Sequence, residues 1–227
     1  VWVPPAPCLL RENNQEMTCE GFSLARHPVT NAQFKAFLDA TGYHPPEKHP
    51  YPESFLSHWN KGKIPKNKED HPVTWVSYVD ALAYCEWARL TLPTEWLWEK
   101  AARGPDGRPY PWGTTKPTKK LTHYKASNTS PVGRFSETRS PYGCEDLIGN
   151  VSEWCQLSQD LDAMPSEIPE VDLTPPLKNS VVRGGCFLRA SDRAMLAAHR
   201  RMLSVTRRNQ WVGFRPAFIG SWCAAES

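Results

Sequence analysis

Several features that mark membrane, zinc-binding and nucleic-acid-binding proteins are missing from this sequence of 227 residues. No apolar run approaches the roughly 20 residues that a membrane-spanning helix needs. No Cys-x-x-Cys pair occurs, so the common zinc spacings and the thioredoxin-like motif are absent. The 27 Lys and Arg against 24 Asp and Glu leave a net charge of only +3. Such a small excess does not indicate nucleic acid or a membrane surface as the partner.

Internal repeats, heptads and low-complexity tracts are also absent, whereas proline and tryptophan are abundant. The chain has 22 Pro and 10 Trp, which indicates a loop-rich fold with an aromatic core rather than long helices. A chain of this length buries most of its apolar surface without needing disulfide or metal staples. We therefore predict a single globular domain that spans residues 1–227.

The cysteines are odd in number, which argues against a complete disulfide framework. They are Cys8, Cys19, Cys85, Cys144, Cys155, Cys186 and Cys223. Free, mostly buried thiols in a reducing compartment are the favoured interpretation, and a disulfide framework is the alternative. This favours a cytoplasmic protein. The N-terminus, Val-Trp-Val-Pro-Pro, resembles a strand and has no basic region typical of a signal peptide.

Three short helices are predicted from capping signals and apolar spacing. The first begins at Thr30, with Gln33 completing a capping box, and ends at Gly42. The second begins after Ser77 and the third after Thr94, because each hydroxyl can cap the following apolar stretch.

Short strands and long loops fill the rest of the prediction. Residues 181–182 and 211–214 are typical of strands. Residues 43–70, 104–130 and 157–179 are rich in proline and charge, as long functional loops often are. Early helices followed by turn-rich β structure indicate one α+β domain.

Seven segments, taken in order, carry a resemblance to a known family. They are Val-Thr-Asn-Ala-Gln-Phe (29–34), His-Pro-Val-Thr-Trp-Val-Ser (71–77), Leu-Pro-Thr-Glu with Trp-Glu-Lys-Ala-Ala-Arg-Gly (92–104), Tyr-Pro-Trp-Gly (110–113), Gly-Asn-Val-Ser-Glu-Trp (149–154), Arg-Gly-Gly (183–185) and Gly-Phe-Arg (213–215). Together they resemble the formylglycine-generating-enzyme-like, or sulfatase-modifying-factor, family. The resemblance implies an irregular, loop-rich variant of the C-type lectin fold, and fold does not by itself imply activity.

The resemblance also supplies a test for catalysis. The family's oxidases use two cysteines to bind copper, and these positions fall at Arg189 and Ala194 here. Neither side chain is a thiolate, so no copper is expected. Cys186 stands where the family usually has serine. It is either a plain buried thiol or, as the alternative, part of a metal-dependent oxidase or sulfur-transferring enzyme.

Histidines offer little further support for an enzyme. His44, His49 and His58 lie in one long loop, and we expect them to be exposed to solvent. No spacing typical of a facial triad on a helix occurs.

A structural calcium site is implied by the same resemblance. The ligands would be Asp146, Gly149, Val151 and Glu153, and carboxylate and carbonyl oxygens suit this cation. The alternative is that the two carboxylates tie loops together through hydrogen bonds.

The C-terminal segment is the candidate binding surface. Eight arginines lie between positions 183 and 215, where Arg200, Arg208 and the Gly-Phe-Arg end keep the family's spacing and are expected to hold the fold. The candidate ligand-binding residues are Phe187, Arg189, Ser191, Arg193, Met195, His199, Arg201, Leu203, Thr206, Arg207, Asn209 and Trp211. Mixed charged, aromatic and aliphatic side chains on a rigid scaffold are typical of a binding surface, and also of an exposed loop.

Variable proteins of diversity-generating retroelements use this segment of the same fold to bind ligands. The resemblance therefore favours a non-catalytic binding module, with Trp211, Arg189 and Arg207 as anchors because Trp and Arg dominate binding hot spots. An acidic protein, peptide or glycan would suit the charge. A third hypothesis is a regulatory domain of a longer signalling protein.

Overall fold

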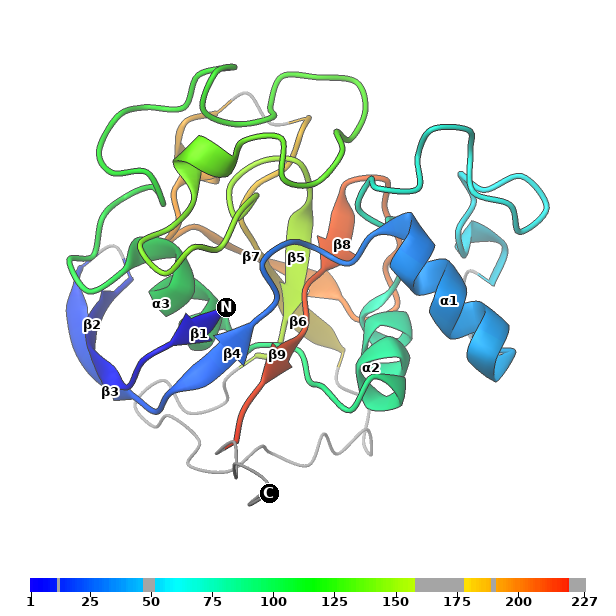
Figure 1. The fold of residues 1–227 in the computed structure, drawn as a ribbon, viewed down its shortest axis with the longest axis horizontal. Helices are drawn as coiled ribbons and strands as arrows, with labels where there is room; N and C mark the ends of the chain where they lie inside the picture. Colours follow the sequence, from blue (N-terminus) through cyan, green and yellow to red (C-terminus); the bar gives the residue numbers. More distant parts are fainter. Residues whose placement is uncertain (12, 47–51, 158–177, 189–190, 221–227) are drawn as a thin grey trace, which may run out of the picture.

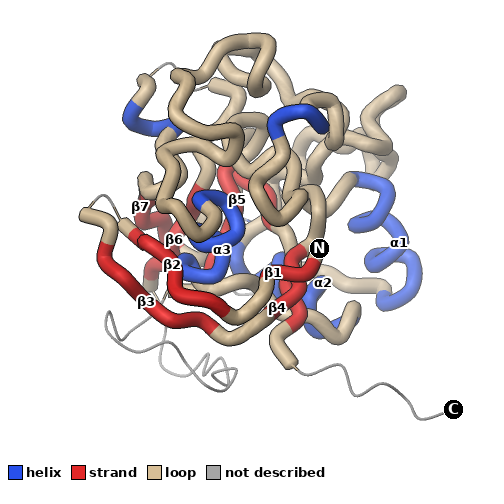
Figure 2. The backbone as a smooth tube through the Cα atoms, turned by 60° about the vertical axis from the view of Figure 1, so that its left-hand side comes forward, coloured by secondary structure: helices blue, strands red, loops and turns tan. Residues whose placement is uncertain are grey.

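The computed structural model describes residues 1–11, 13–46, 52–157, 178–188 and 191–220. Its longer helices are α1 (Asn31–Thr41), α2 (Tyr78–Trp87) and α3 (Glu95–Arg103), with one-turn helices at Pro52–Ser54, Ser136–Thr138 and Arg193–Met195. The strands are β1 (Trp2–Val3), β2 (Ala6–Leu10), β3 (Gln15–Cys19), β4 (Phe22–Leu24), β5 (Ser152–Cys155), β6 (Asn179–Arg183), β7 (Arg200–Ser204), β8 (Val212–Phe214) and β9 (Ala217–Phe218). Loops form much of the molecule (Figures 1 and 2), which confirms the predicted irregular α+β fold.

The three predicted helices begin where their caps were expected. The hydroxyl of Thr30 accepts a hydrogen bond from the Gln33 backbone N–H, and the Gln33 side-chain oxygen accepts one from the Thr30 backbone N–H. Gly42 ends α1 in the left-handed conformation. Ser77 caps α2 with a second reciprocal box, and Thr94 caps α3. Local side-chain chemistry therefore fixes these boundaries.

A four-stranded sheet in the order β7-β6-β5-β8 forms the centre of the molecule. β5 pairs parallel with β8, whereas the pairs β5–β6 and β6–β7 are antiparallel. A second sheet has the order β1-β4-β9, and β2 and β3 form a separate hairpin. The β5 arrow lies in the middle of Figure 1, with α3 on one side and α1 and α2 on the other.

Side chains alternate across this sheet, so its two faces join different apolar clusters. On the face of α3, Cys155 and Val181 pack with Trp98. On the face of α1 and α2, Trp154 and Val182 pack in a cluster that is rich in aromatic rings.

The β2–β3 hairpin was not predicted. Arg11 begins the turn, and its backbone N–H donates to Glu99 Oε1 at 2.5 Å. The Arg103 guanidinium donates to the Arg11 carbonyl at 2.6 Å and to the Asn14 amide oxygen at 2.7 Å. These contacts hold the hairpin turn against α3. The sequence signal for this turn was the pair Asn13 and Asn14, which follows the short apolar stretch 7–10.

Six cysteines lie within the described residues, and all six are free and buried. This confirms the predicted free thiols, while Cys223 lies outside the described residues. Across the described part of the chain, no helix combines the length and apolar character needed to cross a membrane.

Candidate functional site

Buried pairs of arginine and carboxylate form the frame of the site. Arg215 donates from Nε and Nη2 to the Glu153 carboxylate at 2.7 and 2.8 Å, and Trp98 Nε1 donates to the same carboxylate at 2.6 Å. Arg208 makes a second bidentate pair with Asp80, at 2.8 and 3.0 Å. The four charged side chains in these two pairs are fully buried. Arg208 and Arg215 therefore hold the fold, as expected.

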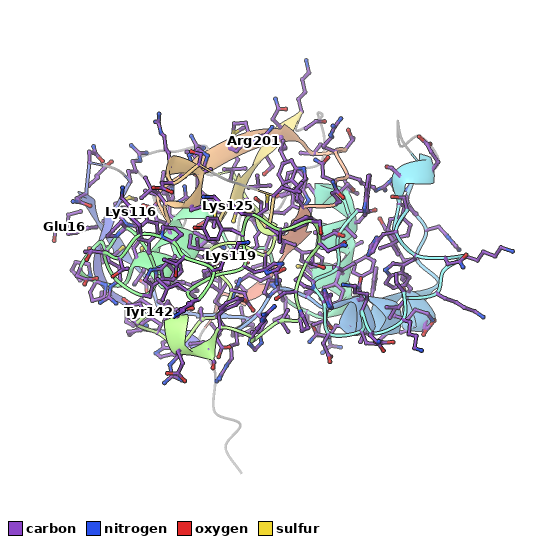
Figure 3. The ribbon with its side chains drawn as sticks, turned by 90° about the horizontal axis from the view of Figure 1, so that it is seen from above. Glu16, Lys116, Lys119, Lys125, Tyr142 and Arg201 are labelled. Carbon is purple, nitrogen blue, oxygen red and sulfur yellow. The ribbon has the colours of Figure 1, made fainter. Side chains whose placement is uncertain are left out.

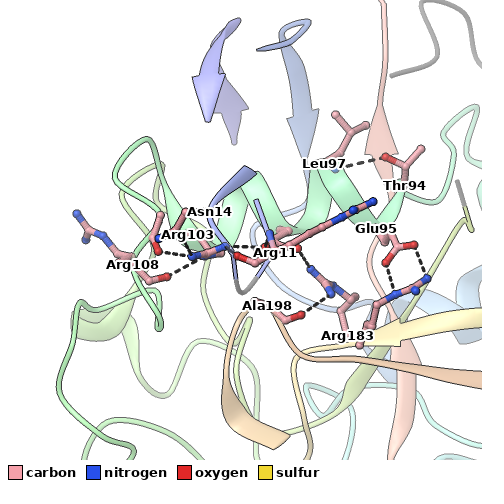
Figure 4. Close-up of polar contacts among 12 residues, drawn as sticks. Arg11, Asn14, Thr94, Glu95, Leu97, Arg103, Arg108, Arg183 and Ala198 are labelled. Carbon is pink, nitrogen blue, oxygen red and sulfur yellow. Dashed lines mark hydrogen bonds and ion pairs between the residues drawn. The ribbon is translucent and has the colours of Figure 1, made fainter. Parts of the chain in front are cut away.

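Two more pairs connect α3 to the central sheet. Arg200 donates to both oxygens of Glu95, at 2.8 and 2.7 Å. Glu99 accepts from Arg103 at 2.8 Å and from Arg183, whose guanidinium also donates to the Ala198 carbonyl (Figure 4). The family's Arg-Gly-Gly segment is thus anchored to α3 by charge as well as packing.

The residues implied as calcium ligands do not fit a cation site well. Both oxygens of Glu153 already face the Arg215 guanidinium, whose charge would oppose a cation. One oxygen of Asp146 accepts from the Gly133 backbone at 2.7 Å, and burial raises the pKa of this carboxyl. The two carboxylates therefore tie loops together. Calcium at Asp146, Gly149, Val151 and Glu153 stays a prediction without support from this geometry.

The structure divides the candidate binding segment between the two faces of the central sheet. Arg200 points toward Glu95 and α3, whereas its neighbour Arg201 stacks on Trp211 on the other face, with Cζ 5.0 Å from the ring centroid. Strand alternation produces this separation. A contiguous stretch of sequence therefore provides two distinct surfaces.

The first surface, which we name the docking face, lies on β7 and in the turn that follows it. It consists of Arg201, Leu203, Thr206, Arg207, Asn209 and Trp211. Arg201 and Arg207 are exposed, and Trp211 is half-buried against the aromatic cluster. Figure 3 shows Arg201 at the edge of the molecule. A guanidinium stacked on a supported ring is a preformed cationic and aromatic contact.

The second surface is a cavity of about 380 Å³ on the side of α3, which we name the arginine pocket. It is lined by Arg11, Trp96, Glu99, Arg183, Arg193, Ala198, His199 and Arg200. Of the predicted binding residues, only Arg193 and His199 line it. Sequence reasoning missed Arg11 and Trp96 because the hairpin and α3 bring them in from distant parts of the chain.

The remaining candidates differ in exposure. Ser191 is exposed. Phe187 and Met195 are buried to 1% and 0% exposure, so the expectation that they contribute to a binding surface is corrected. Both are large apolar side chains, and both are buried in the interior of the protein. Arg189 lies outside the described residues.

The positions tied to oxidase chemistry do not assemble a metal centre among the described residues. Cys186 is buried. His44 is exposed as expected, but His58 is half-buried and burial lowers its pKa to about 4, which corrects the expectation for that residue. His49 lies outside the described residues. Within the ranges that the structure covers, no group of three or more His, Cys, Asp or Glu side chains could hold a metal.

Comparison with known proteins identifies the family. The profile of the sulfatase-modifying factor enzyme 1-like domain matches residues 1–218. The chain belongs to this family. The formylglycine-generating enzyme of Thermomonospora curvata is 32% identical over 218 residues, covering 74% of this chain and 71% of that enzyme.

In two other relatives, the region that matches this sulfatase-modifying-factor domain is part of a longer protein. Serine/threonine-protein kinase Pkn1 of Chlamydia trachomatis is 34% identical over 214 residues, covering 88% of this chain and 34% of the kinase. Hercynine oxygenase of Mycolicibacterium smegmatis is 35% identical over 155 residues, covering 59% of this chain and 36% of the oxygenase. The chain thus spans about a third of the length of these two relatives.

Solved structures share the fold at low sequence identity. Treponema denticola variable protein 1 superposes with a TM-score of 0.68 and 19% identity, covering 96% of this chain and 93% of the other. PvdO from Pseudomonas aeruginosa superposes with a TM-score of 0.71 and 20% identity, covering 96% and 93%. At this identity the likeness shows the fold alone.

Proposed function

We propose that this sulfatase-modifying-factor domain is a non-catalytic binding module whose ligand docks on the docking face. The observation that carries the proposal is the Arg201–Trp211 stack, held on a frame of buried ion pairs. The ligand is a protein, peptide or glycan of acidic character. The shared fold with a variable protein supports a related use, that of a diversity-generating-retroelement variable protein.

Two features favour binding over oxidation. According to the family resemblance, the oxidases have a pair of cysteines at two positions, and this chain has Arg189 and Ala194 there. The aromatic and arginine side chains of the docking face are the types that carry most binding energy in protein interfaces. Arg201 is pre-positioned by the Trp211 ring, which reduces the side-chain entropy lost on binding.

Binding to an immobilised poly-glutamate peptide tests the proposal, with poly-lysine as the charge control. We expect the wild-type domain to bind poly-glutamate, and the double variant Arg201→Ala/Arg207→Ala to bind about tenfold more weakly or worse. The matched control is Arg134→Ala, because Arg134 is also exposed and stacked on an aromatic ring, Phe135, at 5.5 Å. Equal weakening by the control, or full binding by the double variant, would contradict the proposed face.

Two relatives are enzymes, so the second candidate function is that of a metal-dependent oxidase or sulfur-transferring enzyme. Formylglycine-generating enzyme and hercynine oxygenase are both similar in sequence. Purified domain, loaded with copper or iron, would be incubated in air with a cysteine-containing peptide, alone and together with hercynine, which the name of one relative gives as its substrate. We expect no aldehyde and no new sulfur–carbon bond. Either product, lost in a Cys186→Ser variant, would replace the binding proposal with an oxidase or sulfur-transferring enzyme.

The match to about a third of the Pkn1 kinase favours a further possibility, a regulatory domain within a longer signalling protein. Ligand binding on the docking face would then be the signal that this regulatory domain senses. We also propose a reducing, cytoplasmic location, in keeping with six free thiols among the described residues.

A further inference from the structure

The outer edge of β7 is open within the part of the chain that the structure describes. β7 is the last strand of the central sheet, whose order is β7-β6-β5-β8, so only its inner edge faces β6. Its five residues pair with β6 in unbroken register, from Arg200 opposite Arg183 to Ser204 opposite Asn179. Four of the five are exposed, and the exposed fraction of Met202 is 43%.

Antiparallel pairing fixes which residues of β7 bond to β6. The N–H of Val205 donates to the Lys178 carbonyl at 3.2 Å, which makes this a hydrogen-bonded pair that continues the register of the strands. Hydrogen-bonded pairs alternate with non-hydrogen-bonded pairs along an antiparallel ladder. Arg201 and Leu203 therefore direct their backbone groups toward β6.

The other three residues, Arg200, Met202 and Ser204, direct their N–H and C=O groups to the outer edge. The Ser204 carbonyl accepts from the Arg207 N–H at 2.9 Å, and the remaining groups make no hydrogen bond with a described residue. An exposed row of such groups is a template for pairing with another chain. Proline, lysine or a bulge commonly blunts an edge of this kind, and β7 has none of them.

The opposite edge of the same sheet is closed. All three residues of β8 are buried. The Val29 N–H donates to the Phe214 carbonyl at 2.9 Å, so the segment before α1 pairs with this edge. Of the two edges of the central sheet, β7 is therefore the one that a partner strand can reach.

Positive charge beside the open edge selects the partner. Arg201 and Arg207 are exposed, and neither forms an ion pair with a described residue. Arg200 is neutralised by Glu95 on the other face. Since Arg201 bonds to β6, its partner in an added antiparallel strand occupies a non-hydrogen-bonded pair, in which facing side chains are closest. A carboxylate at that position would lie beside the guanidinium.

We propose that an extended acidic segment of a partner protein adds to β7 as an antiparallel fifth strand of the central sheet. Its backbone bonds to the outward groups of β7. One carboxylate faces Arg201, and apolar side chains lie beside Met202 and Leu203. The inference rests on the proposed function, because Arg201 and Leu203 belong to the docking face, and it narrows the ligand to an extended polypeptide.

A capped, fluorescent peptide with the sequence Ser-Thr-Val-Val-Glu-Thr-Ser tests the inference. In the proposed register its valines lie opposite Leu203 and Met202, and its glutamate lies opposite Arg201. We expect fluorescence anisotropy to show binding to the intact domain. N-methylation of the second valine removes the N–H that donates to the Met202 carbonyl, and should weaken binding about tenfold or more. The matched control is N-methylation of the glutamate, whose N–H points away from β7, and it should bind like the parent peptide.

Met202→Pro removes the outward N–H from the protein side. An edge strand tolerates proline where its N–H faces solvent, so the thermal midpoint should stay close to that of the wild type. We expect binding about tenfold weaker or worse. Met202→Ala keeps the N–H and should bind more tightly than Met202→Pro. If Met202→Pro fails to fold, the N-methylated peptides still decide, because they are measured on the wild-type domain.

Amide hydrogen exchange, followed by NMR, gives a direct readout of the new strand. Peptide binding should slow exchange of the Met202 and Ser204 N–H groups about tenfold or more, since each gains a hydrogen-bond partner. Exchange of the Arg201 N–H, which already bonds to β6, should change little.

Equal affinity of the two N-methylated peptides would overturn the inference. If the variant Arg201→Ala/Arg207→Ala also loses the parent peptide, that result leaves the docking face intact and rejects only the added strand. Equal binding of a peptide with glutamine in place of glutamate would contradict the acidic partner. Sedimentation of the domain alone completes the test, because a dimer that Met202→Pro dissociates would show that a second copy of the chain occupies the edge instead.

Discussion

Arginines in this protein connect segments that are far apart in the sequence. The pairs Glu153–Arg215 and Asp80–Arg208 are separated by 62 and 128 residues, and their charges are fully buried. A buried pair of this kind gains little over apolar packing but is costly to break, because the remaining charge keeps its desolvation penalty. At this scale the arginines therefore divide into buried, paired ones such as Arg208 and Arg215 and exposed ones such as Arg201, while Arg200 is exposed but paired with the buried Glu95.

Glu153→Gln should show the cost of breaking a buried pair. The variant leaves the buried Arg215 guanidinium without its counter-charge, and we expect a loss of about 3 to 5 kcal/mol in the free energy of unfolding. Urea unfolding followed by tryptophan fluorescence measures it. The control is Asp39→Asn, which breaks an exposed pair with Lys35 and should cost at most about 0.5 kcal/mol. Similar losses in both variants would show that burial does not decide the cost.

His71 should make stability fall in mild acid. Burial, aided by the charge of Lys68, lowers the pKa of His71 from 6.5 to about 4. Between these two values the unfolded chain binds more protons than the folded one, so the free energy of unfolding decreases as the pH falls through this window.

Unfolding measured at several pH values between 7.5 and 4.5 tests this. His71→Gln should reduce the slope by up to about 1.4 kcal/mol per pH unit. The exposed His44 provides the control, since His44→Gln should leave the slope unchanged. An unaltered slope in His71→Gln would mean that other groups, such as His58, cause the effect.

At the scale of elements, caps decide where the helices begin and end. Thr30 and Ser77 each make a reciprocal capping box, and Gly42 ends α1 with a φ of 63°. No atom lies within 4 Å of a Cβ added at Gly42, so only the backbone conformation resists a side chain there.

Gly42→Ala should therefore destabilise the domain by about 1 kcal/mol, which is the cost of the left-handed conformation alone. Gly42→Asn should cost less, because asparagine tolerates this conformation. Thermal unfolding of both variants gives the comparison. If alanine and asparagine cost the same, a lost contact rather than backbone conformation would be the cause.

At the scale of the whole molecule, the fold buries the six thiols of the described residues. Cys85, Cys144 and Cys155 are buried, and burial raises the pKa of each thiol. Cys8 and Cys19 face each other across the β2–β3 hairpin, with their sulfurs 3.5 Å apart. Because a reagent must reach the sulfur, buried thiols react slowly, even where a hydrogen bond from Cys8 lowers the pKa of the Cys19 thiol.

Labelling with a thiol-reactive dye should distinguish the folded from the unfolded chain. In a Cys223→Ser variant, the six described cysteines should react slowly in native buffer and rapidly in denaturant, because reaction requires both exposure and thiolate. Mass spectrometry counts the labels. Fast labelling of one thiol in the native protein would single out a reactive cysteine, and Cys186 would be the first to examine.

The sequence by itself determined the local features of this protein. The hydroxyls of Thr30, Ser77 and Thr94 predicted three helix starts, because a cap acts within its own turn. The ordered family segments predicted the α+β fold, and the odd cysteine count favoured free thiols.

Only the tertiary structure decided the sites. Alternation along β7 sent Arg200 and Arg201 to opposite faces, and divided one predicted surface into two. The hairpin and α3 brought Arg11 and Trp96 to Arg183, across more than 80 residues of sequence. The physical reason is that which side chains share a cavity depends on strand pairing and packing between distant segments, and a linear pattern does not record either.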